Sequence, residues 1–264
     1  MKKKTLWMHR GIVGLLIGYL LLPILVTFLY SVATAWYHSI LPEGYTLKWY
    51  GMLFSNMRFW EALGRSFLVS IIPIVLCLMM MLLAIFAISI YFPQYEKLLQ
   101  SVVLLPYAIP GVVLAISLIR LYATSLGNSI GLLVFAYTIF IIPYMYQGIR
   151  NSLRTINIGK LVEAAELLGA TKIQAFKMVI LPNILPGIQI SMLLSFSVLF
   201  GEFTFVNLLL GGNYETVQMY LYKMLSESGH VSSALVVTFF TIVLIISYIV
   251  LRLTKSIEVK KVHG

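Results

Sequence analysis

The sequence predicts an all-α membrane protein with six transmembrane helices and both termini in the cytoplasm. Hydrophobic residues make up 60% of the 264 residues and charged residues only 11%, whereas about a quarter of the residues of soluble domains are charged. The mean hydropathy is +0.95. Six apolar segments reach the roughly 20 residues that a helix needs to cross a bilayer. The predicted spans are about 11–34, 66–91, 101–123, 129–149, 186–210 and 231–253.

The orientation follows from the positions of the 19 lysine and arginine residues. With the N-terminus inside, most of them lie in cytoplasmic segments, as the positive-inside rule requires. The net charge of +10 is therefore a topology signal, and we expect no nucleic-acid partner. The one cysteine, Cys77, lies in an apolar run, so neither a disulfide framework nor a CxxC-type metal site is expected. We predict no metal site elsewhere.

The first span follows the basic stretch MKKK and precedes Ala33-Thr34-Ala35, a pattern that also resembles a secretory signal with its cleavage site. Its apolar run of about 20 residues is longer than the ~7–15 residues of a signal peptide, so we expect an uncleaved span. The aromatic residues between the first two spans suit an interfacial helix on the outer surface, and a simple connector explains them equally well.

Two later segments have predicted local features. Pro106, Pro110 and Gly111 favour a bend in the third span, because proline removes a backbone donor and clashes with the preceding turn. The external loop 211–230 is expected to hold a short helix near 215–226.

The only sizeable cytoplasmic segment, 150–185, interrupts the apolar pattern between the fourth and fifth spans. Its first half has the spacing of a helix with one apolar face. That face consists of Ile158, Leu161, Val162, Ala165 and Leu168. Gly169 predicts the end of this helix, since glycine adopts the left-handed conformation without a steric penalty.

A second helix is predicted directly after the glycine. Thr171 and Gln174 fit a capping box, which marks a helix start. We expect this helix to end near Leu181-Pro182, and we expect Pro186 and Gly187 to separate it from the fifth span.

The composition of the first of these helices favours a protein partner over the lipid surface. Membrane-surface helices usually carry lysine and arginine on their polar face. Here the polar positions include Glu163 and Glu166, and the small residues Ala164 and Ala165 permit close approach to another protein.

These residues resemble the EAA loop of ABC importer permeases. The family pattern is EAA, three residues, Gly, nine residues, Ile, one residue, and Leu-Pro. The chain matches it at 163–165, Gly169 and 179–182, with valine in the isoleucine position. The stretches LLPYAIPGVVLA (104–115) and FGEFTFVNLLLGG (200–212) are also typical of this superfamily. The resemblance covers nearly the whole chain and implies one type I importer permease domain, 1–264, in a bacterial cell membrane.

The resemblance also implies partners. It predicts two P-loop ATPase subunits, a second permease subunit that is either identical or a sister chain, and an external solute-binding protein. The chain has no GxxxxGK[ST] loop, so ATP hydrolysis is expected in the partner, and we predict neither enzymatic activity nor a cofactor. The residues that would dock the ATPase or anchor the return to the membrane are Glu163, Ala164, Ala165, Gly169, Leu181 and Pro182.

A polar strip on the fifth span is a candidate lining for the pathway. Ser191, Ser195 and Glu202 fall within about 40° of one another on a helix. Glu202 is the one acidic residue well inside a predicted span, which makes it a functional candidate by default. A structural role, such as capping a helix, is the alternative.

The solute is the least determined property. The resemblance extends to permeases for polyamines, aminoethylphosphonate and ferric iron, and we favour a polyamine such as spermidine or putrescine. Two other classes remain open. A secondary transporter would require inverted repeats and several intramembrane charges, and a non-transporting scaffold explains the composition but not the EAA spacing.

Overall fold

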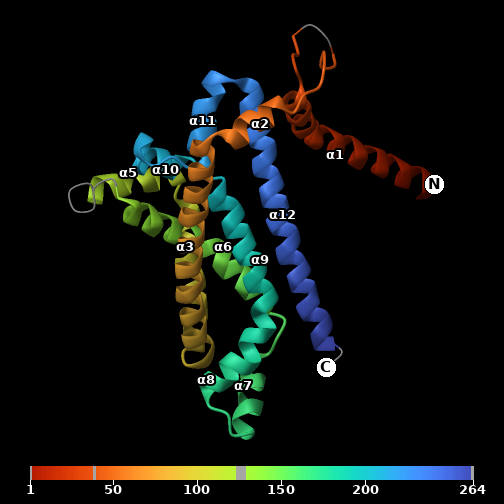
Figure 1. The fold of residues 1–264 in the computed structure, drawn as a ribbon. Helices are drawn as coiled ribbons and strands as arrows, with labels where there is room; N and C mark the ends of the chain where they lie inside the picture. Colours follow the sequence, from red (N-terminus) through yellow and green to blue (C-terminus); the bar gives the residue numbers. More distant parts are fainter. Residues whose placement is uncertain (1, 38–39, 123–128, 263–264) are drawn as a thin grey trace. The chain divides into compact units, whose positions relative to one another are not determined.

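The computed structural model describes residues 2–37, 40–122 and 129–262, and these residues are almost entirely helical (Figure 1). The helices are α1 (Lys2–Val32), α2 (Lys48–Ser55), α3 (Met57–Ile90), the 3-10 helix η1 (Pro93–Tyr95), α4 (Glu96–Ala108), α5 (Gly111–Tyr122), α6 (Ile130–Leu153), α7 (Ile158–Leu167), α8 (Lys172–Ala175), the π-helix η2 (Phe176–Ile180), α9 (Leu181–Phe200), α10 (Thr204–Leu209), the 3-10 helix η3 (Gly211–Asn213), α11 (Val217–Glu227) and α12 (Gly229–Val262). The predicted all-α class is confirmed.

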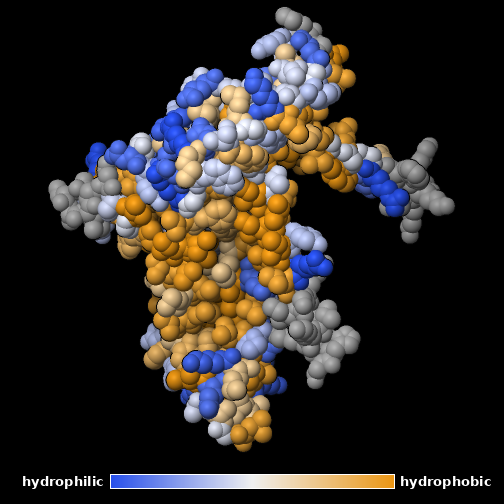
Figure 2. Space-filling model, viewed as in Figure 1, coloured by the Kyte–Doolittle hydropathy of each residue, from blue (hydrophilic) through white to orange (hydrophobic). Residues whose placement is uncertain are grey.

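Five helices within the described residues are long and apolar enough to cross a membrane, and the bent pair α4–α5 is a sixth candidate if it counts as one span. The five are Met8–Val32, Met57–Ile90, Ile130–Leu153, Lys172–Phe200 and Gly229–Thr254. Figure 2 shows the corresponding broad hydrophobic surface over α3, with hydrophilic side chains gathered near the ends of the helices. The chain is therefore built as a multi-pass membrane protein.

The third predicted span is broken into two helices. The segment Pro93–Ala108 meets α5 at 93°. The break lies at Ile109, whose extended backbone (φ −103°, ψ 119°) is the conformation that a following proline favours. The predicted bend is thus present, and it is sharper than a kink within one continuous helix. Residue 123, the last of that predicted span, lies outside the described residues.

The chain forms two compact units, residues 1–61 with 220–244, and residues 62–219 with 245–264. In the first unit, the His230 ring stacks between the Tyr30 ring, 4.2 Å away between centroids, and the Trp49 ring, 4.9 Å away. The Trp49 indole N–H donates to the carbonyl of Ala33 at 2.7 Å. These contacts hold the end of α1, α2 and the start of α12 together.

In the second unit, α6 and α9 pack along each other at a contact made by small residues. A Cβ added to Gly148 would lie 2.5 Å from the Cβ of Ser191, and one added to Gly187 would collide with Ser152. Small residues let membrane helices approach backbone to backbone. The same unit contains the helix α7 and the two elements that it packs against, α8 and η2.

Candidate functional site: the α7–α8 end and the helix that follows it

The helix α7 begins at Asn157, whose side-chain oxygen accepts a hydrogen bond from the backbone N–H of Lys160 at 3.1 Å. This bond satisfies one of the free N–H groups of the first turn. Val162 and Ala165 are the buried residues of the helix, because α7 packs against α8 and η2. The described start and the inward face agree with the predicted amphipathic helix.

The turn after α7 is built around Gly169, which has a φ of +85°. The N–H of Gly169 donates to the carbonyl of Glu166 at 2.9 Å, and the N–H of Ala170 donates to the carbonyl of Ala165 at 3.0 Å. These two bonds form a Schellman motif, in which a left-handed residue closes the helix end. The predicted stop at Gly169 is confirmed.

The next helix starts with the predicted capping box. The Thr171 hydroxyl accepts from the Gln174 N–H at 3.3 Å, and the Gln174 side chain accepts from the Thr171 N–H at 2.8 Å. Both halves of the box are therefore present, and α8 begins at Lys172, with four residues between it and the end of α7.

The predicted helix end at Leu181-Pro182 is wrong. The chain continues from Lys172 to Phe200 as one helix of 29 residues. Just before Pro182 the ladder widens into a π-helical turn, in which the N–H of Leu181 donates to the carbonyl of Phe176, five residues back. Pro182 then occupies an early position in α9, where its missing N–H is tolerated.

The same correction applies to the predicted break between this helix and the fifth span. Pro186 lies inside α9, and Gly187 is buried against α6. A neighbouring side chain also satisfies the backbone near Pro182, since the Asn183 amide donates to the carbonyl of Val179 at 2.8 Å. Prolines are accepted in membrane helices when such groups supply the missing partners.

The structure separates the six predicted docking residues into two groups. Glu163, Ala164 and Gly169 are exposed together at the turn. Ala165 is only 8% exposed and packs within the chain, while Leu181 and Pro182 are half-buried in the continuous helix. Docking by this set stays a prediction, and only the first group is available on the surface of the chain.

Two exposed leucines were not predicted. Leu167 is 84% exposed and Leu168 is 89% exposed, although the helical spacing assigned Leu168 to the buried face. Leu168 is the C-cap of α7, so the helical projection no longer applies at its position. The signal available in the sequence was the pair of leucines directly before Gly169, where the helix was already expected to end. In Figure 2 the α7–α8 end carries hydrophobic and hydrophilic residues side by side.

The two serines of the candidate pathway lie inside the chain. Ser191 and Ser195 are both fully buried. The Ser191 hydroxyl donates to the carbonyl of Ile188 at 2.8 Å and lies 3.2 Å from the sulfur of Met145 on α6. Their burial gives the pathway hypothesis no support, and the lining of a pathway by these residues stays a prediction.

Glu202 lies in the turn between α9 and α10, outside both helices. Its Oε1 accepts from the N–H groups of Thr204 at 2.6 Å and Phe205 at 3.0 Å. Its Oε2 accepts from the N–H of Phe205 and from the hydroxyl of Tyr137, both at 2.9 Å. The carboxylate thus caps α10 and ties it to α6, which is the geometry of the structural alternative. A pathway role for Glu202 stays a prediction.

Comparison with known families decides what kind of protein carries this arrangement. Residues 66–258 match the family of binding-protein-dependent transport system inner membrane components. The chain belongs to this family. The matched region runs from α3 into α12 and contains the whole of the α7–α8 end and the Glu202 turn.

Individual relatives of this family member cover nearly its full length. The spermidine/putrescine transport system permease protein PotC of Escherichia coli strain K12 is 24% identical over 259 residues, with 97% of this chain and 96% of PotC aligned. PhnV of Salmonella typhimurium, named for 2-aminoethylphosphonate transport, is 23% identical over 251 residues, with 93% of each chain aligned.

Solved structures agree on the fold. A chain of a bacterial ABC transporter involved in the import of the acidic polysaccharide alginate superposes with a TM-score of 0.71, at 16% identity and with 96% of each chain covered. At this identity the likeness shows the fold alone. The expected type I ABC importer permease fold is therefore confirmed, and this family member is a multi-pass inner-membrane transport component.

Proposed function

We propose that this permease couples ATP hydrolysis in separate subunits to the import of a small hydrophilic solute. The whole chain, 1–264, acts as one permease domain, and the segment 150–185 is its contact with two P-loop ATPase subunits. A second permease subunit, identical or a sister chain, completes the pathway, and an external binding protein delivers the solute. Family membership supports the transport role.

The observation that carries the ATPase contact is the construction of the α7–α8 end. A Schellman turn and a capping box fix its conformation, and yet it exposes Leu167 and Leu168. Burying one leucine side chain is worth about 1.5–3 kcal/mol. A rigid turn that leaves two leucines in water is therefore best explained by a partner groove that covers them, with Glu163 as an adjacent charged contact.

The orientation supports the same assignment. Lys160, Lys172 and Lys177 lie on this segment, and the positive-inside rule places such segments in the cytoplasm, where ATP is available. We therefore propose that the α7–α8 end and both termini are cytoplasmic.

The second permease subunit is proposed from membership of the transport-component family. The resemblance to type I importer permeases implies a pathway that lies between two such chains. We propose that two permease chains, either identical or sister chains, form a dimer and that the transport pathway lies between them.

For the solute we propose a polyamine, such as spermidine or putrescine. The support is the near-complete alignment with PotC, which carries that substrate class in its name. Aminoethylphosphonate and ferric iron are the competing solutes. An ATPase assay distinguishes the three solutes. The complex is reconstituted with the co-purified binding protein, and the transported solute is the one that raises its ATPase rate.

The docking proposal is tested by affinity co-purification of the tagged chain from mild-detergent membranes. We expect a P-loop ATPase with the wild-type protein and at least tenfold less of it with Leu168→Gln, since about 1.4 kcal/mol of lost contact energy corresponds to tenfold in affinity. Leu98→Gln is the matched control, because Leu98 is an exposed leucine on α4, outside the α7–α8 end. Equal ATPase recovery with both variants would contradict the docking site. If no ATPase co-purifies with the wild-type protein, the hypotheses of a secondary transporter and of a scaffold would again be open.

A further inference from the structure

A cavity of about 640 Å³ opens where α3 ends, α4 begins and α6 ends. Its volume is in the range of roughly 300–1,000 Å³ that is usual for small-ligand sites. Because these are the ends of membrane helices, the cavity lies at the boundary between lipid and water. Its wall combines apolar and charged side chains, including Ile85, Leu99, Leu153, Glu96, Arg150 and Arg154.

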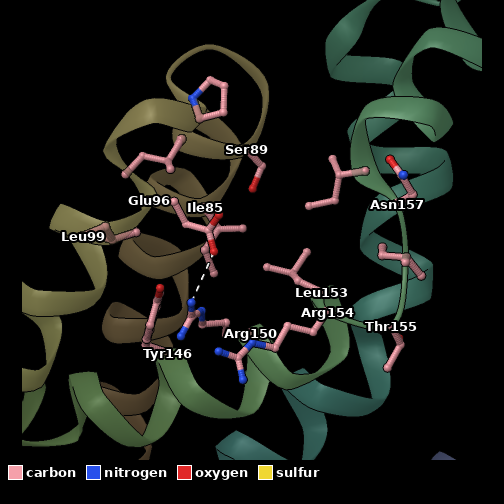
Figure 3. A pocket seen from close by; sticks show the side chains of 14 residues that line it. Ile85, Ser89, Glu96, Leu99, Tyr146, Arg150, Leu153, Arg154, Thr155 and Asn157 are labelled. Carbon is pink, nitrogen blue, oxygen red and sulfur yellow. Dashed lines mark hydrogen bonds and ion pairs between the residues drawn. The ribbon is translucent and has the colours of Figure 1, made fainter.

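Two arginines and one glutamate line this cavity, and the glutamate is paired with one of the arginines (Figure 3). Arg150 and Arg154 are four residues apart at the end of α6, so they occupy the same face. The Arg150 Nη2 lies 3.5 Å from the Glu96 Oε1, which is long for a hydrogen bond. Within the described part of the chain, Arg154 has no ion pair. The wall of the cavity therefore has an excess of one positive charge.

The Arg150 guanidinium is held in place but is poorly satisfied. It lies over the Tyr146 ring, 5.8 Å from the centroid. Its side chain is only 18% exposed, and its buried Nε has no hydrogen-bond partner among the described residues. Leaving a buried N–H unpaired is unfavourable, so this atom points to a ligand that accepts a hydrogen bond.

A structural explanation covers only part of these observations. Arginines are favourable near a helix C-terminus, because the helix dipole is negative there. That effect accounts for Arg150 in the last turn of α6 and Arg154 at its C-cap. It does not account for a hollow in front of them, nor for a buried Nε without an acceptor.

We propose that this cavity binds a phosphate-bearing anion through Arg150 and Arg154. The planar guanidinium groups match the oxygen geometry of phosphate, and the apolar wall leaves room for a non-polar group attached to it. Basic pockets between membrane helices bind anionic lipid headgroups, and a soluble phosphate offers the same chemistry. The exposed leucines Leu167 and Leu168 do not line this cavity, although its two arginines lie at the start of the segment 150–185 and its wall includes the first residue of α7. The binding test uses the isolated permease, so its result does not depend on the ATPase contact.

The test is a binding titration of the delipidated, full-length protein in detergent, read by native mass spectrometry. The probes are phosphatidylglycerol, phosphatidylcholine and inorganic phosphate. We expect phosphatidylglycerol to bind more tightly than phosphatidylcholine. Arg150→Gln and Arg154→Gln should each weaken it about tenfold, the size expected for losing a charge-assisted hydrogen bond. Glu96→Gln should strengthen binding a few-fold, because it removes the competing carboxylate.

Lys97→Gln is the matched control, since it removes one exposed positive charge beside the cavity without touching its wall. Competition by inorganic phosphate would identify a soluble phosphate as a sufficient ligand, and its failure would identify the lipid headgroup. Both outcomes support the site. An equal effect of Lys97→Gln and Arg154→Gln, or no binding of either phosphate probe, would overturn it. Arg154→Gln and Glu96→Gln change exposed side chains, so the test stands even if Arg150→Gln fails to fold.

Discussion

At the scale of single residues, Glu202 is a charged group that is a functional candidate from the sequence. In the structure, neighbouring residues use its carboxylate as a hydrogen-bond acceptor. Its two oxygens accept four hydrogen bonds, one from the N–H of Thr204, two from the shared N–H of Phe205 and one from the hydroxyl of Tyr137. A carboxylate at the start of a helix is also favoured by the helix dipole. The residue joins α9, α10 and α6 at one point.

We therefore predict that Glu202→Gln lowers the stability of the protein and that any loss of transport follows from this loss of stability. The amide would point an N–H₂ group at donors that now face a carboxylate oxygen, which should cost about 1–3 kcal/mol. The measurement is the thermal unfolding temperature of the purified protein in detergent. Tyr137→Phe, which removes one of the four bonds, should lower it less. A Glu202→Gln protein with wild-type unfolding and no transport would instead support a pathway role.

At the scale of elements, the α7–α8 turn is defined by backbone conformation and has open space around it. Gly169 has a φ of +85°, and nothing lies within 4 Å of a Cβ built there. A side chain at this position would therefore fit sterically but would have to adopt a left-handed backbone. For most residues this costs roughly 1–2 kcal/mol.

Two substitutions of Gly169 test the need for the left-handed backbone, because both add a side chain but only one of them disfavours that conformation. Gly169→Asn should retain most ATPase co-purification, because asparagine is several-fold enriched in the left-handed region. Gly169→Val should lose it, since β-branched residues are outliers there. Hydrogen exchange of residues 163–171 should rise in the valine variant alone. Equal loss in both variants would mean that Gly169 itself contacts the partner.

Local rules explain which parts of this region were predictable from sequence. The stop at Gly169 and the box of Thr171 and Gln174 depend on bonds between residues a few positions apart, and both were predicted correctly. The helix end at Pro182 was predicted wrongly. The π-helical turn before the proline and the hydrogen bond from the Asn183 side chain allow the helix to continue through it. Helical spacing likewise identified the face that carries Ser191, but it could not show that α6 covers that face.

At the scale of the whole molecule, the chain alternates between membrane helices and two sets of connecting segments. From the distribution of lysine and arginine, we predict that α7 and both termini lie in the cytoplasm and that α11 lies outside. Cys77 is the one cysteine of the sequence and is buried. The wild-type protein therefore provides an unlabelled background for a topology experiment.

We predict opposite labelling of two exposed positions by a membrane-impermeant maleimide. Ser226→Cys, on α11, should react in intact cells, and Glu163→Cys, on α7, should react only in inverted vesicles. The wild-type chain should remain unlabelled in both preparations. Labelling of Glu163→Cys from the outside of intact cells would reverse the orientation and would rule out an ATPase contact at α7.

The unbroken helix from Lys172 to Phe200 has a mechanical consequence. Its close contact with α6 at Gly187 lies near the middle of its length. At 1.5 Å per residue, the arms on either side are about 22 Å and about 20 Å long. We expect such a rod to act as a lever that pivots on this contact. A displacement of the α8 end would then appear, in the opposite direction, at the Glu202 turn.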